Sequence, residues 1–356
     1  MRRTADHDAV AIGVVGAGRI AERVHFNILS RLGGVRVVAV AEPSAARAAV
    51  IAKHFPSADS VPDARMLLAR FAIDALVVCS PPVSHAETAR MALEAGIHVY
   101  VEKPVAVTSE AARELVALAQ ASGCVAMAGF NYRRHPLLER LRLEVRSGRI
   151  GQPILMRSAF AAAHSSAAEW QASPVTGGGA LLELGSHHFD LARFLFDAEA
   201  VDVSARVWAR HQEGDTATVE FRLASGVSGQ SVFAIGATDE DRIDILGESG
   251  IARFDRMRGD LSFEAQRFAY GRRHALAREF QTVGRSLHRV SKPLGEPSYQ
   301  RSLAAFVDAV RTRKPARPDL RDGLRSLEWI EAAVRSATTG MRAEVSTIDA
   351  PAGRDA

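Results

Sequence analysis

The pattern of hydrophobic and polar positions divides the chain into two parts. In the first part, short apolar runs rich in β-branched residues alternate with alanine-rich amphipathic stretches. Continuous apolar runs are typical of parallel strands that helices bury on both faces. The predicted strands are residues 10–15, 35–41, 74–80, 96–101 and 124–129. The predicted helices include residues 44–54, 63–71, 84–94 and 108–122, and a capping-box pattern, Ser84-His-Ala-Glu87, opens the third of these.

Past residue 130 the period of the pattern changes to two. Ala217, Val219, Phe221 and Leu223 point to one side of a predicted strand, and polar residues point to the other. Similar strands are predicted at residues 154–160, 201–207, 228–235, 242–246 and 251–254, and helices at residues 136–147 and 180–196. This is typical of an antiparallel sheet with one buried face, which helices predicted at residues 276–290, 299–313 and 322–338 could cover. We therefore expect an α/β protein with a parallel-sheet domain, residues 1–130, and a mostly antiparallel α/β domain, residues 131–356.

A glycine-rich turn joins the first predicted strand to a helix that ends at Leu29. The sequence Gly16-Ala-Gly18-Arg-Ile-Ala21 fits the G-x-G-x-x-G/A pattern. Gly16 permits the tight turn, and Gly18 lets a pyrophosphate approach the backbone N–H groups at the start of the helix. The second strand ends at Glu42, where a carboxylate can accept hydrogen bonds from ribose hydroxyls. The spacing favours a dinucleotide site, although strand–helix turns without a ligand also use glycine.

Other candidate residues directly follow predicted parallel strands, whose carboxyl ends are where ligands bind. Ser80 and Pro81 follow the third strand, and Glu102-Lys103-Pro104 follows the fourth. The ammonium of Lys103 could hydrogen-bond a substrate oxygen and stabilise alkoxide character as a hydride leaves the same carbon. The alternative is an exposed loop lysine. Only four of the 45 lysine and arginine residues are lysines, which slightly favours the functional interpretation.

A second set of candidates lies in the predicted helix that follows Gly177–Gly179. Glu183 and His187 are four residues apart and so share a helical face, where the carboxylate could fix the tautomer of the imidazole and raise its basicity. Such a histidine is suited to act as a general base. An ordinary surface pair is one alternative, and His188 is expected to be a bystander of that kind. A zinc site with Asp190 is another alternative, but neighbouring histidines point about 100° apart on a helix, so we expect no metal.

The composition argues against several classes of protein. A net charge of +4 over 356 residues is too small to indicate general nucleic-acid binding. No run approaches the roughly 18 apolar residues that a membrane helix needs. No signal-peptide pattern precedes the first strand. The two cysteines, Cys79 and Cys124, fit no metal-binding or redox spacing and suit a reducing compartment. We therefore expect a cytoplasmic protein with a small-molecule substrate.

Together these motifs resemble those of the Gfo/Idh/MocA family of oxidoreductases. The similar stretches are the glycine-rich turn, Ser80-Pro-Pro with His85, residues 96–104, residues 177–190, and residues 302–310, 322–323 and 331–333. The resemblance runs from Val10 to about Val345. It implies an N-terminal Rossmann dinucleotide-binding domain and a C-terminal α/β domain with a large open sheet used in oligomerisation. A homodimer or homotetramer is therefore expected.

The resemblance also implies roles for individual residues. Lys103 matches the family's catalytic lysine, and His187 matches the histidine that takes the substrate hydroxyl proton. Glu183 stands where many members have Asp, so its longer side chain must retract or rotate to orient His187. The residues implied for cofactor binding are Gly16, Gly18, Arg19, Ile20, Glu42, Ser80, Pro81, His85, Glu102 and Lys103, and those for substrate binding are Lys103, Tyr132, Arg133, Trp170 and His187.

The expected reaction is reversible hydride transfer between the C4 atom of a nicotinamide and a secondary alcohol of a sugar, cyclitol or sugar derivative. NAD is expected to bind more tightly than NADP, because Glu42 would repel the 2′-phosphate, although Arg47 in the next helix could reach that phosphate. Three alternatives stay open. They are a relative that uses tightly held NAD transiently in elimination or hydrolysis, a non-catalytic NAD(P)-binding sensor, and a metal-dependent hydrolase.

A basic segment, residues 266–292, carries seven arginines and lysines against Glu279 alone. Leu276, Phe280, Val283, Leu287 and Val290 form a narrow apolar stripe at helical spacing. The preferred interpretation is a helix that packs on its own sheet with a solvated basic back. An oligomer or partner contact, and a basic amphipathic helix that meets an anionic surface, are the alternatives.

Overall fold

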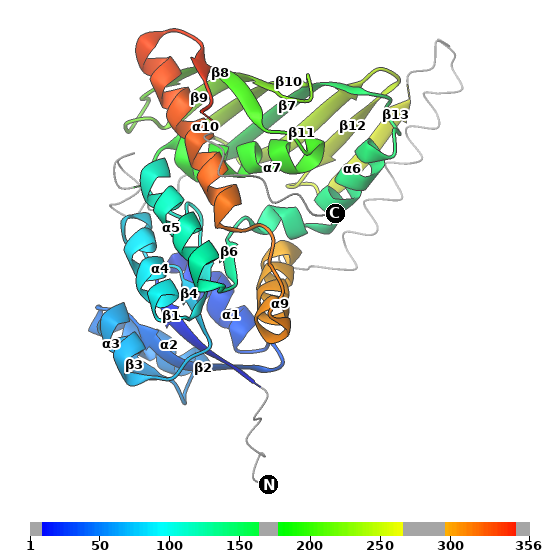
Figure 1. Cartoon of the computed structure of the whole chain (residues 1–356). Helices are drawn as coiled ribbons and strands as arrows, with labels where there is room; N and C mark the ends of the chain where they lie inside the picture. The colour runs from blue at the N-terminus through cyan, green and yellow to red at the C-terminus, as the bar shows by residue number, and fades with distance from the viewer. Residues whose placement is uncertain (1–8, 164–176, 266–295, 347–356) are drawn as a thin grey trace.

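The computed structural model describes residues 9–163, 177–265 and 296–346. Two sheets lie one above the other, each with its own covering helices (Figure 1). Trp170 and the basic segment 266–292 lie outside the described residues. Among the described residues, no helix is both long and apolar enough to cross a membrane.

The first sheet has six parallel strands in the order β3-β2-β1-β4-β5-β6. The strands are β1 (Val10–Val15), β2 (Val35–Ala41), β3 (Asp59–Val61), β4 (Ala75–Val78), β5 (His98–Val101) and β6 (Ala126–Ala128). This order is that of dinucleotide-binding folds, in which ligands lie at the carboxyl ends of the strands. The sequence predicted every strand except β3, whose three residues are too few to show a period.

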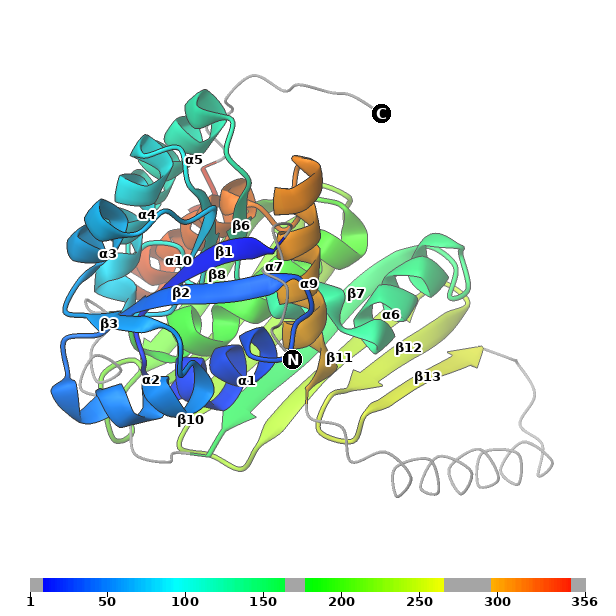
Figure 2. The same cartoon turned by 90° about the horizontal axis from the view of Figure 1, so that it is seen from below.

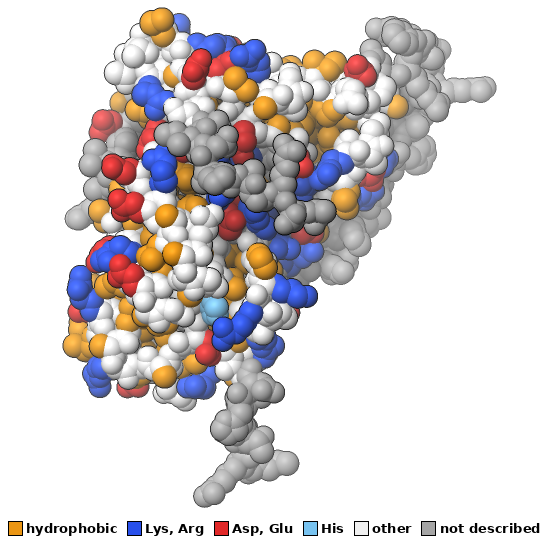
Figure 3. Space-filling model, in the orientation of Figure 1, with side chains coloured by type: hydrophobic (Ala, Val, Ile, Leu, Met, Phe, Trp, Pro, Cys, Tyr) orange, Lys and Arg blue, Asp and Glu red, His pale blue; other side chains and the backbone are white. Residues whose placement is uncertain are grey.

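Helices cover both faces of this sheet. They are η1 (Ala21–His25), α1 (Phe26–Leu29), η2 (Ala45–Arg47), α2 (Ala48–His54), α3 (Ala64–Arg70), η3 (Pro82–Ser84), α4 (His85–Glu94) and α5 (Ser109–Ser122). Figure 2 shows α1 and α2 on one side of the sheet and α3, α4 and α5 on the other. The helices pack through buried apolar residues such as Phe26 and Ile51 on the first face and Leu67 and Leu115 on the second. Basic and acidic side chains are interspersed over the helices of this sheet (Figure 3).

A helix from the last fifth of the chain completes the cover of the first sheet. The prediction that this helix, α9 (Pro297–Thr312), covers the antiparallel sheet was wrong. Its Leu303 and Phe306 join the cluster that contains Ile12 and Tyr100, and the rings of Phe306 and Tyr100 lie 5.7 Å apart. Helical periodicity shows that one face is buried but not which sheet it meets.

The second sheet has eight strands in the order β13-β12-β11-β7-β10-β9-β8-β14. They are β7 (Pro153–Ala162), β8 (Ala200–Trp208), β9 (Thr216–Leu223), β10 (Ser228–Ile235), β11 (Glu240–Gly247), β12 (Gly250–Asp255), β13 (Asp260–Ala265) and β14 (Ala343–Glu344). The pairings are antiparallel except that of β7 with β10. The alternation predicted along β9 is confirmed, because its four apolar residues from Ala217 to Leu223 are buried. In β8 a register shift after Ala200 leaves Val201 exposed, against the predicted alternation.

The remaining helices cover one face of the second sheet (Figure 1). They are η4 (Asn131–Arg134), α6 (Pro136–Arg146), η7 (Leu181–Gly185), α7 (Ser186–Phe196) and α10 (Leu320–Thr339). Trp329 of α10 lies fully buried at the centre of this layer, where its ring stacks on Phe189 at 4.6 Å and meets the edge of Phe221 at 4.9 Å. On the opposite face, Glu220, Gln230 and Val232 are exposed, so the described elements leave this face open.

Candidate active site

The glycine-rich turn has the backbone that its sequence predicts. Gly16 has φ +94°, and a Cβ atom there would stand 2.7 Å from the backbone nitrogen of Ser80, so only glycine fits. A Cβ atom at Gly18 would meet no atom within 4 Å, which leaves open space in front of the turn. Arg19 is exposed and Ile20 is half-buried at the start of η1. Backbone N–H groups at such a helix start suit a pyrophosphate.

Glu42 lies beside this turn at the end of β2. Its Oε2 accepts a hydrogen bond from the N–H of Ala17 at 2.8 Å, and its Oε1 accepts one from the N–H of Ser44 at 3.0 Å. A carboxylate has about four acceptor positions, so further hydrogen bonds from ribose hydroxyls fit this group. The side chain of Arg47 also contacts the turn, because its Nη1 donates to the carbonyl oxygen of Ala17.

His85 links the ends of two strands of the first sheet. Its Nδ1 lies 2.7 Å from the carbonyl oxygen of Pro104, and its Nε2 lies 2.7 Å from that of Ser80. Burial lowers the pKa of His85, and the two carbonyl oxygens act against that shift. Both ring nitrogens are therefore engaged within the protein, where His85 links the backbone at Ser80 with that at Pro104, and a contact of His85 with the cofactor stays a prediction.

The predicted capping box at the start of α4 is not formed. Ser84 makes no capping hydrogen bond. Instead its Oγ donates to the carbonyl oxygen of Pro81 at 2.9 Å and lies 2.7 Å from the Oγ of Ser80. The prediction was wrong because the short helix η3 precedes α4 and gives Ser84 a helical backbone, whereas a capping residue needs an extended one.

Lys103 is held at both its backbone and its ammonium. Its Nζ donates to the carbonyl oxygen of Glu183 at 2.7 Å, and its N–H donates to Oε2 of Glu102 at 3.2 Å. Burial lowers the pKa of Lys103, and the charges of Glu183 and Glu102 oppose this shift. The alternative of an exposed loop lysine is thus wrong.

His187 is buried on the other side of the same site. Its ring stacks on Tyr132 with the centroids 4.4 Å apart, and Phe130 and Phe160 lie around it. Burial lowers the pKa of His187 well below 6.5, and the charges of Lys103, His188 and Arg256 lower it further. The imidazole is therefore neutral at neutral pH, which is the state that a general base needs.

Glu183 contacts Lys103, which the sequence did not suggest. It belongs to the π-helical turn η7, where the regular spacing of an α-helix does not hold. Its carbonyl oxygen binds the Lys103 ammonium, and its charge acts on the pKa of Lys103. The Nδ1 atom of His187 is buried without a hydrogen-bond partner in the described part of the chain. Orientation of His187 by Glu183 stays a prediction, and stacking on Tyr132 supports the ring instead.

The sequence did not predict a cluster of buried charged residues that lies next to Tyr132. His188 is fully buried and its Nε2 lies 3.1 Å from Oδ1 of Asp241, so its assignment as a surface bystander was wrong. Asp241 also accepts from Nε of Arg256 at 2.6 Å, and this guanidinium stands 5.0 Å from the Tyr132 ring. One signal was present in the sequence, since the alternation along β11 places Asp241 on the same buried face as Ile243.

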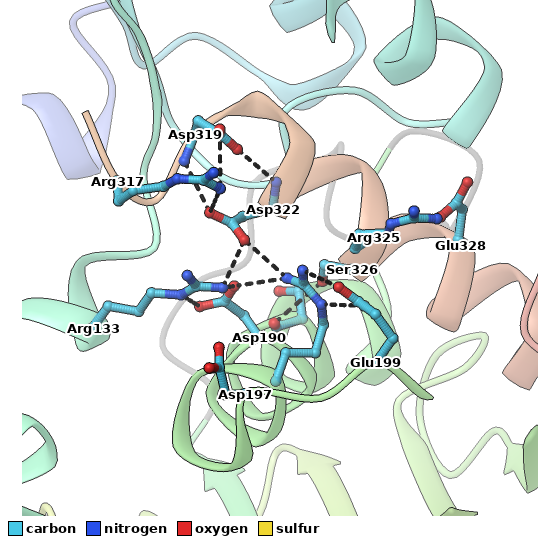
Figure 4. A network of polar contacts seen from close by, with 12 residues as sticks. Arg133, Asp190, Asp197, Glu199, Arg317, Asp319, Asp322, Arg325, Ser326 and Glu328 are labelled. Atoms are coloured by element: carbon cyan, nitrogen blue, oxygen red, sulfur yellow. Dashed lines mark hydrogen bonds and ion pairs between the residues drawn. The ribbon is translucent and has the colours of Figure 1, made fainter. Parts of the chain in front are cut away.

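Arg133 belongs to a network of ion pairs between η4, α7 and α10 (Figure 4). Its Nε and Nη2 donate to both oxygens of Asp190 at 2.8 and 2.6 Å, and Nη2 also meets Asp322 at 3.0 Å. The Arg133 guanidinium is held by carboxylates of the protein, and its contact with a substrate stays a prediction. The same contacts engage Asp190, and no group of three or more His, Cys, Asp or Glu among the described residues could hold a metal ion.

The site thus has two halves at the carboxyl ends of the parallel strands. Gly16, Gly18, Glu42 and Ser80 form the half that fits a dinucleotide, and Lys103, Glu183, His187 and Tyr132 form the other.

Comparison with known proteins agrees with this arrangement. The Gfo/Idh/MocA model described as oxidoreductase family, NAD-binding Rossmann fold, matches residues 10–130. Its companion, described as oxidoreductase family, C-terminal alpha/beta domain, matches residues 142–345. The chain belongs to the Gfo/Idh/MocA family. This confirms the resemblance seen in the sequence, the fold class, and the NAD-binding oxidoreductase character of the protein.

Relatives in the Gfo/Idh/MocA family cover most of the chain. Inositol 2-dehydrogenase of Rhizobium meliloti is 28% identical over 92% of this chain and 96% of its own length. The dTDP-3,4-didehydro-2,6-dideoxy-alpha-D-glucose 3-reductase of Streptomyces antibioticus is 32% identical over 68% of this chain and 75% of its own length. The WlbA dehydrogenase of Bordetella pertussis, solved with NADH and UDP-GlcNAcA, shares the fold with a TM-score of 0.81 at 23% identity, over 96% of this chain and 99% of its own.

Proposed function

We propose that this Gfo/Idh/MocA protein transfers a hydride reversibly between a nicotinamide cofactor and a secondary alcohol of a sugar, cyclitol or sugar derivative. The observation that carries the proposal is the convergence of Lys103 and His187 in one buried site next to the glycine-rich turn. Relatives named as inositol 2-dehydrogenase and as a deoxysugar 3-reductase support this class of substrate.

The two side chains divide the work on the alcohol. His187 is neutral at neutral pH because burial and nearby cations lower its pKa, so it can accept the hydroxyl proton. Lys103 uses one ammonium hydrogen on the carbonyl oxygen of Glu183, and an ammonium has three. A remaining N–H can therefore bind the alcohol oxygen and stabilise its developing negative charge. The bound nicotinamide supplies the hydride chemistry.

The turn and Glu42 favour NAD over NADP. The Glu42 carboxylate lies against Ala17 of the turn, so a 2′-phosphate would be repelled by its charge. Arg47 lies nearby, but it donates to the carbonyl oxygen of Ala17. Calorimetric titration of the purified protein is expected to give the lower Kd for NAD. Tighter binding of NADP would contradict this assignment.

The substrate class is tested with a panel of sugars and cyclitols, with formation of reduced nicotinamide as the signal. Turnover with at least one member is expected. A cofactor that co-purifies and never exchanges with the bulk pool would favour the alternative of transient oxidation during elimination or hydrolysis. Absence of any turnover, with NAD bound, would favour the sensor alternative.

We also propose a homodimer or homotetramer that uses the open face of the second sheet. Trp208 and Val232 on this sheet are 43% and 48% exposed, so association through this face would bury their apolar surface. A cytoplasmic location is proposed because Cys79 and Cys124 are both free.

A further inference from the structure

Two π-helical turns meet at the same short stretch of chain. The first, η1, follows the glycine-rich turn and ends at His25, and the second, η7, contains Glu183. The side chain of His25 contacts Glu102, and the carbonyl oxygen of Glu183 binds the ammonium of Lys103. Extra residues in a helix of this kind occur frequently at functional sites. Here they bring one group from each half of the chain to residues 102–103.

His25 and Glu102 form a buried hydrogen-bonded pair. Nε2 of His25 lies 2.8 Å from Oε1 of Glu102, and the side chains are 0% and 9% exposed. An ionised carboxylate can only accept, so Nε2 of His25 carries the hydrogen. Nδ1 of His25 is buried without a hydrogen-bond partner in the described residues. The bond to Glu102 is therefore what orients the polar edge of this ring.

The pair has little room to move. Tyr100 and Tyr299 meet the His25 ring edge-on, with centroids 5.9 and 6.1 Å away. A Cβ atom at Gly129 would stand 2.9 Å from both Cα and Oε2 of Glu102, so the end of β6 lies directly against this side chain. Tyr299 comes from α9, whose Leu303 and Phe306 belong to the same apolar cluster as Phe26 of α1.

The other carboxylate oxygen reaches Lys103. Oε2 of Glu102 accepts the backbone N–H of Lys103 at 3.2 Å. We propose that His25 and Glu102 are a positioning pair that fixes Lys103 relative to the glycine-rich turn, and thus relative to the nicotinamide. This inference rests on the proposed function. It assigns Glu102 to Lys103 and His25, where the sequence suggested contact with the cofactor.

The charge of Glu102 gives the pair a second effect. It acts with the charge of Glu183 to oppose the lowering of the Lys103 pKa by burial. Removal of His25 takes away the hydrogen bond to Oε1 of Glu102, so the carboxylate can shift relative to Lys103, and the ammonium then loses its proton at a lower pH. A residue that only filled space would not change this titration.

The test uses His25→Gln, His25→Asn and His25→Leu in the full chain. The amide nitrogen of glutamine can replace Nε2 of His25, whereas that of asparagine is too short to reach Glu102. His54→Leu is the matched control, because His54 packs on Phe26 of the same helical layer without contacting Glu102. The chain has four lysines, so the signal of Lys103 can be followed by NMR with lysine labelled at Cε in the cofactor-free protein.

The expected result separates the variants into two groups. His25→Leu and His25→Asn lower the titration midpoint of Lys103 and reduce kcat by about 10- to 100-fold, since small displacements of a reacting group have effects of that size. His25→Gln and His54→Leu keep both values, and calorimetry shows that NAD affinity changes less than kcat in every variant. Glu102→Gln moves the midpoint in the same direction as His25→Leu.

Two results would overturn the positioning role. One is an unchanged titration midpoint of Lys103 in His25→Leu and His25→Asn. The other is a titration midpoint and a kcat that are as low in His25→Gln as in His25→Asn. If His25→Leu does not fold, the comparison of His25→Gln with His25→Asn still tests the positioning role. Retention of turnover by Lys103→Met would instead contradict the proposed function, and the titration of the cofactor-free protein would still test the pair.

Discussion

At the scale of single residues, burial shifts the pKa values of Lys103 and His187 downwards together. For His187 the neighbouring cations add to the effect of burial, whereas for Lys103 the carboxylates oppose it. The opposing carboxylates thus favour the charged ammonium of Lys103, whereas the surroundings of His187 favour the neutral imidazole.

This difference predicts the pH dependence of kcat/KM in the free enzyme. Because the pKa of His187 is well below 6.5, the acid limb should lie below that pH. Because the pKa of Lys103 is below 10.5, the alkaline limb should begin before that pH. Glu183→Gln removes a charge that raises the pKa of Lys103. The alkaline limb of the kcat/KM profile of this variant should therefore move to lower pH. Glu87→Gln on the exposed side of α4 is the control and should leave the profile unchanged.

Loss of either side chain should affect turnover rather than cofactor binding. Lys103→Met and His187→Ala are each expected to lower kcat by roughly 10²–10⁴, the usual scale for positioned proton-transfer groups. NAD affinity should change little, because the glycine-rich turn and Glu42 are untouched. Glu183→Asp should be tolerated. Near-full turnover in both knockout variants on an identified substrate would show that the assigned roles are wrong.

The residues that could be predicted are those whose role follows from their place after a strand or within a local motif. Gly16, Glu42 and Lys103 are of this kind. The contacts of His25, His188 and Arg256 could not be predicted, because their partners are 77, 53 and 15 residues away and only the fold brings them together. Arg133 shows the reverse case, since its position next to Tyr132 suggested a substrate contact but its partners lie on α7 and α10.

At the scale of elements, one buried carboxylate joins three segments of the chain. Asp322 in the first turn of α10 meets Arg133 of η4 at 3.0 Å, Arg193 of α7 at 3.2 Å and Arg317 at 3.5 Å (Figure 4). It also completes a capping box with Asp319. The sequence predicted a capping box at Ser84 and overlooked this one, because the pattern alone does not show which backbone precedes the helix.

The Asp322 contacts should make a measurable contribution to stability. Burial raises the pKa of Asp322, but Arg133, Arg193 and Arg317 outweigh it and lower the pKa from 3.8 to about 2. A lowered carboxylate pKa stabilises the folded state above the unfolded value of 3.8, and this contribution is lost as the pH falls through about 2. Asp322→Asn should therefore lower the free energy of unfolding by about 3–5 kcal/mol near neutral pH, the scale for breaking a buried ion pair.

Chemical denaturation checks this prediction at several pH values. The difference between Asp322→Asn and the native protein should shrink below pH 3.8. Asp197→Asn is the control, because Asp197 is 72% exposed and its nearest arginine nitrogen is 3.8 Å away. A loss of stability for Asp322→Asn no larger than for the control would contradict the role of the network.

At the scale of the whole molecule, the open face of the second sheet has small uncharged side chains in the middle of one row and arginines at both ends of that row. The strand register places Ala159, Val232 and Thr218 side by side in the middle of the sheet, with Arg206 and Arg242 next to them. Apolar residues inside a polar rim are also the arrangement found in protein interfaces, which supports the proposed oligomer. The alternation of the strands predicted the face, but not whether another part of the chain covers it.

If the proposed oligomer uses this face, Val232→Glu should reduce it to smaller species without unfolding the protein. A charge at this position would be buried without a partner on association. Light scattering after size exclusion measures the mass, and Leu143→Glu on α6 is the control, because Leu143 is 69% exposed on the helical side. An unchanged mass would place any interface elsewhere.

The basic segment 266–292 lies outside the described residues. A variant with the charges of Arg278 and Arg285 reversed is still expected to keep its fold and its assembly state.

The position of α9 has a consequence for synthesis of the protein. The apolar side chains of the first sheet that α9 covers, such as Ile12 and Tyr100, are made well before Leu303 and Phe306 leave the ribosome. Domains generally form as units during translation, N-terminal regions first. Here the nascent nucleotide-binding half must wait, with part of its core uncovered, until almost the whole second half has been translated. Apolar surface that stays exposed during that interval favours aggregation of the growing chain.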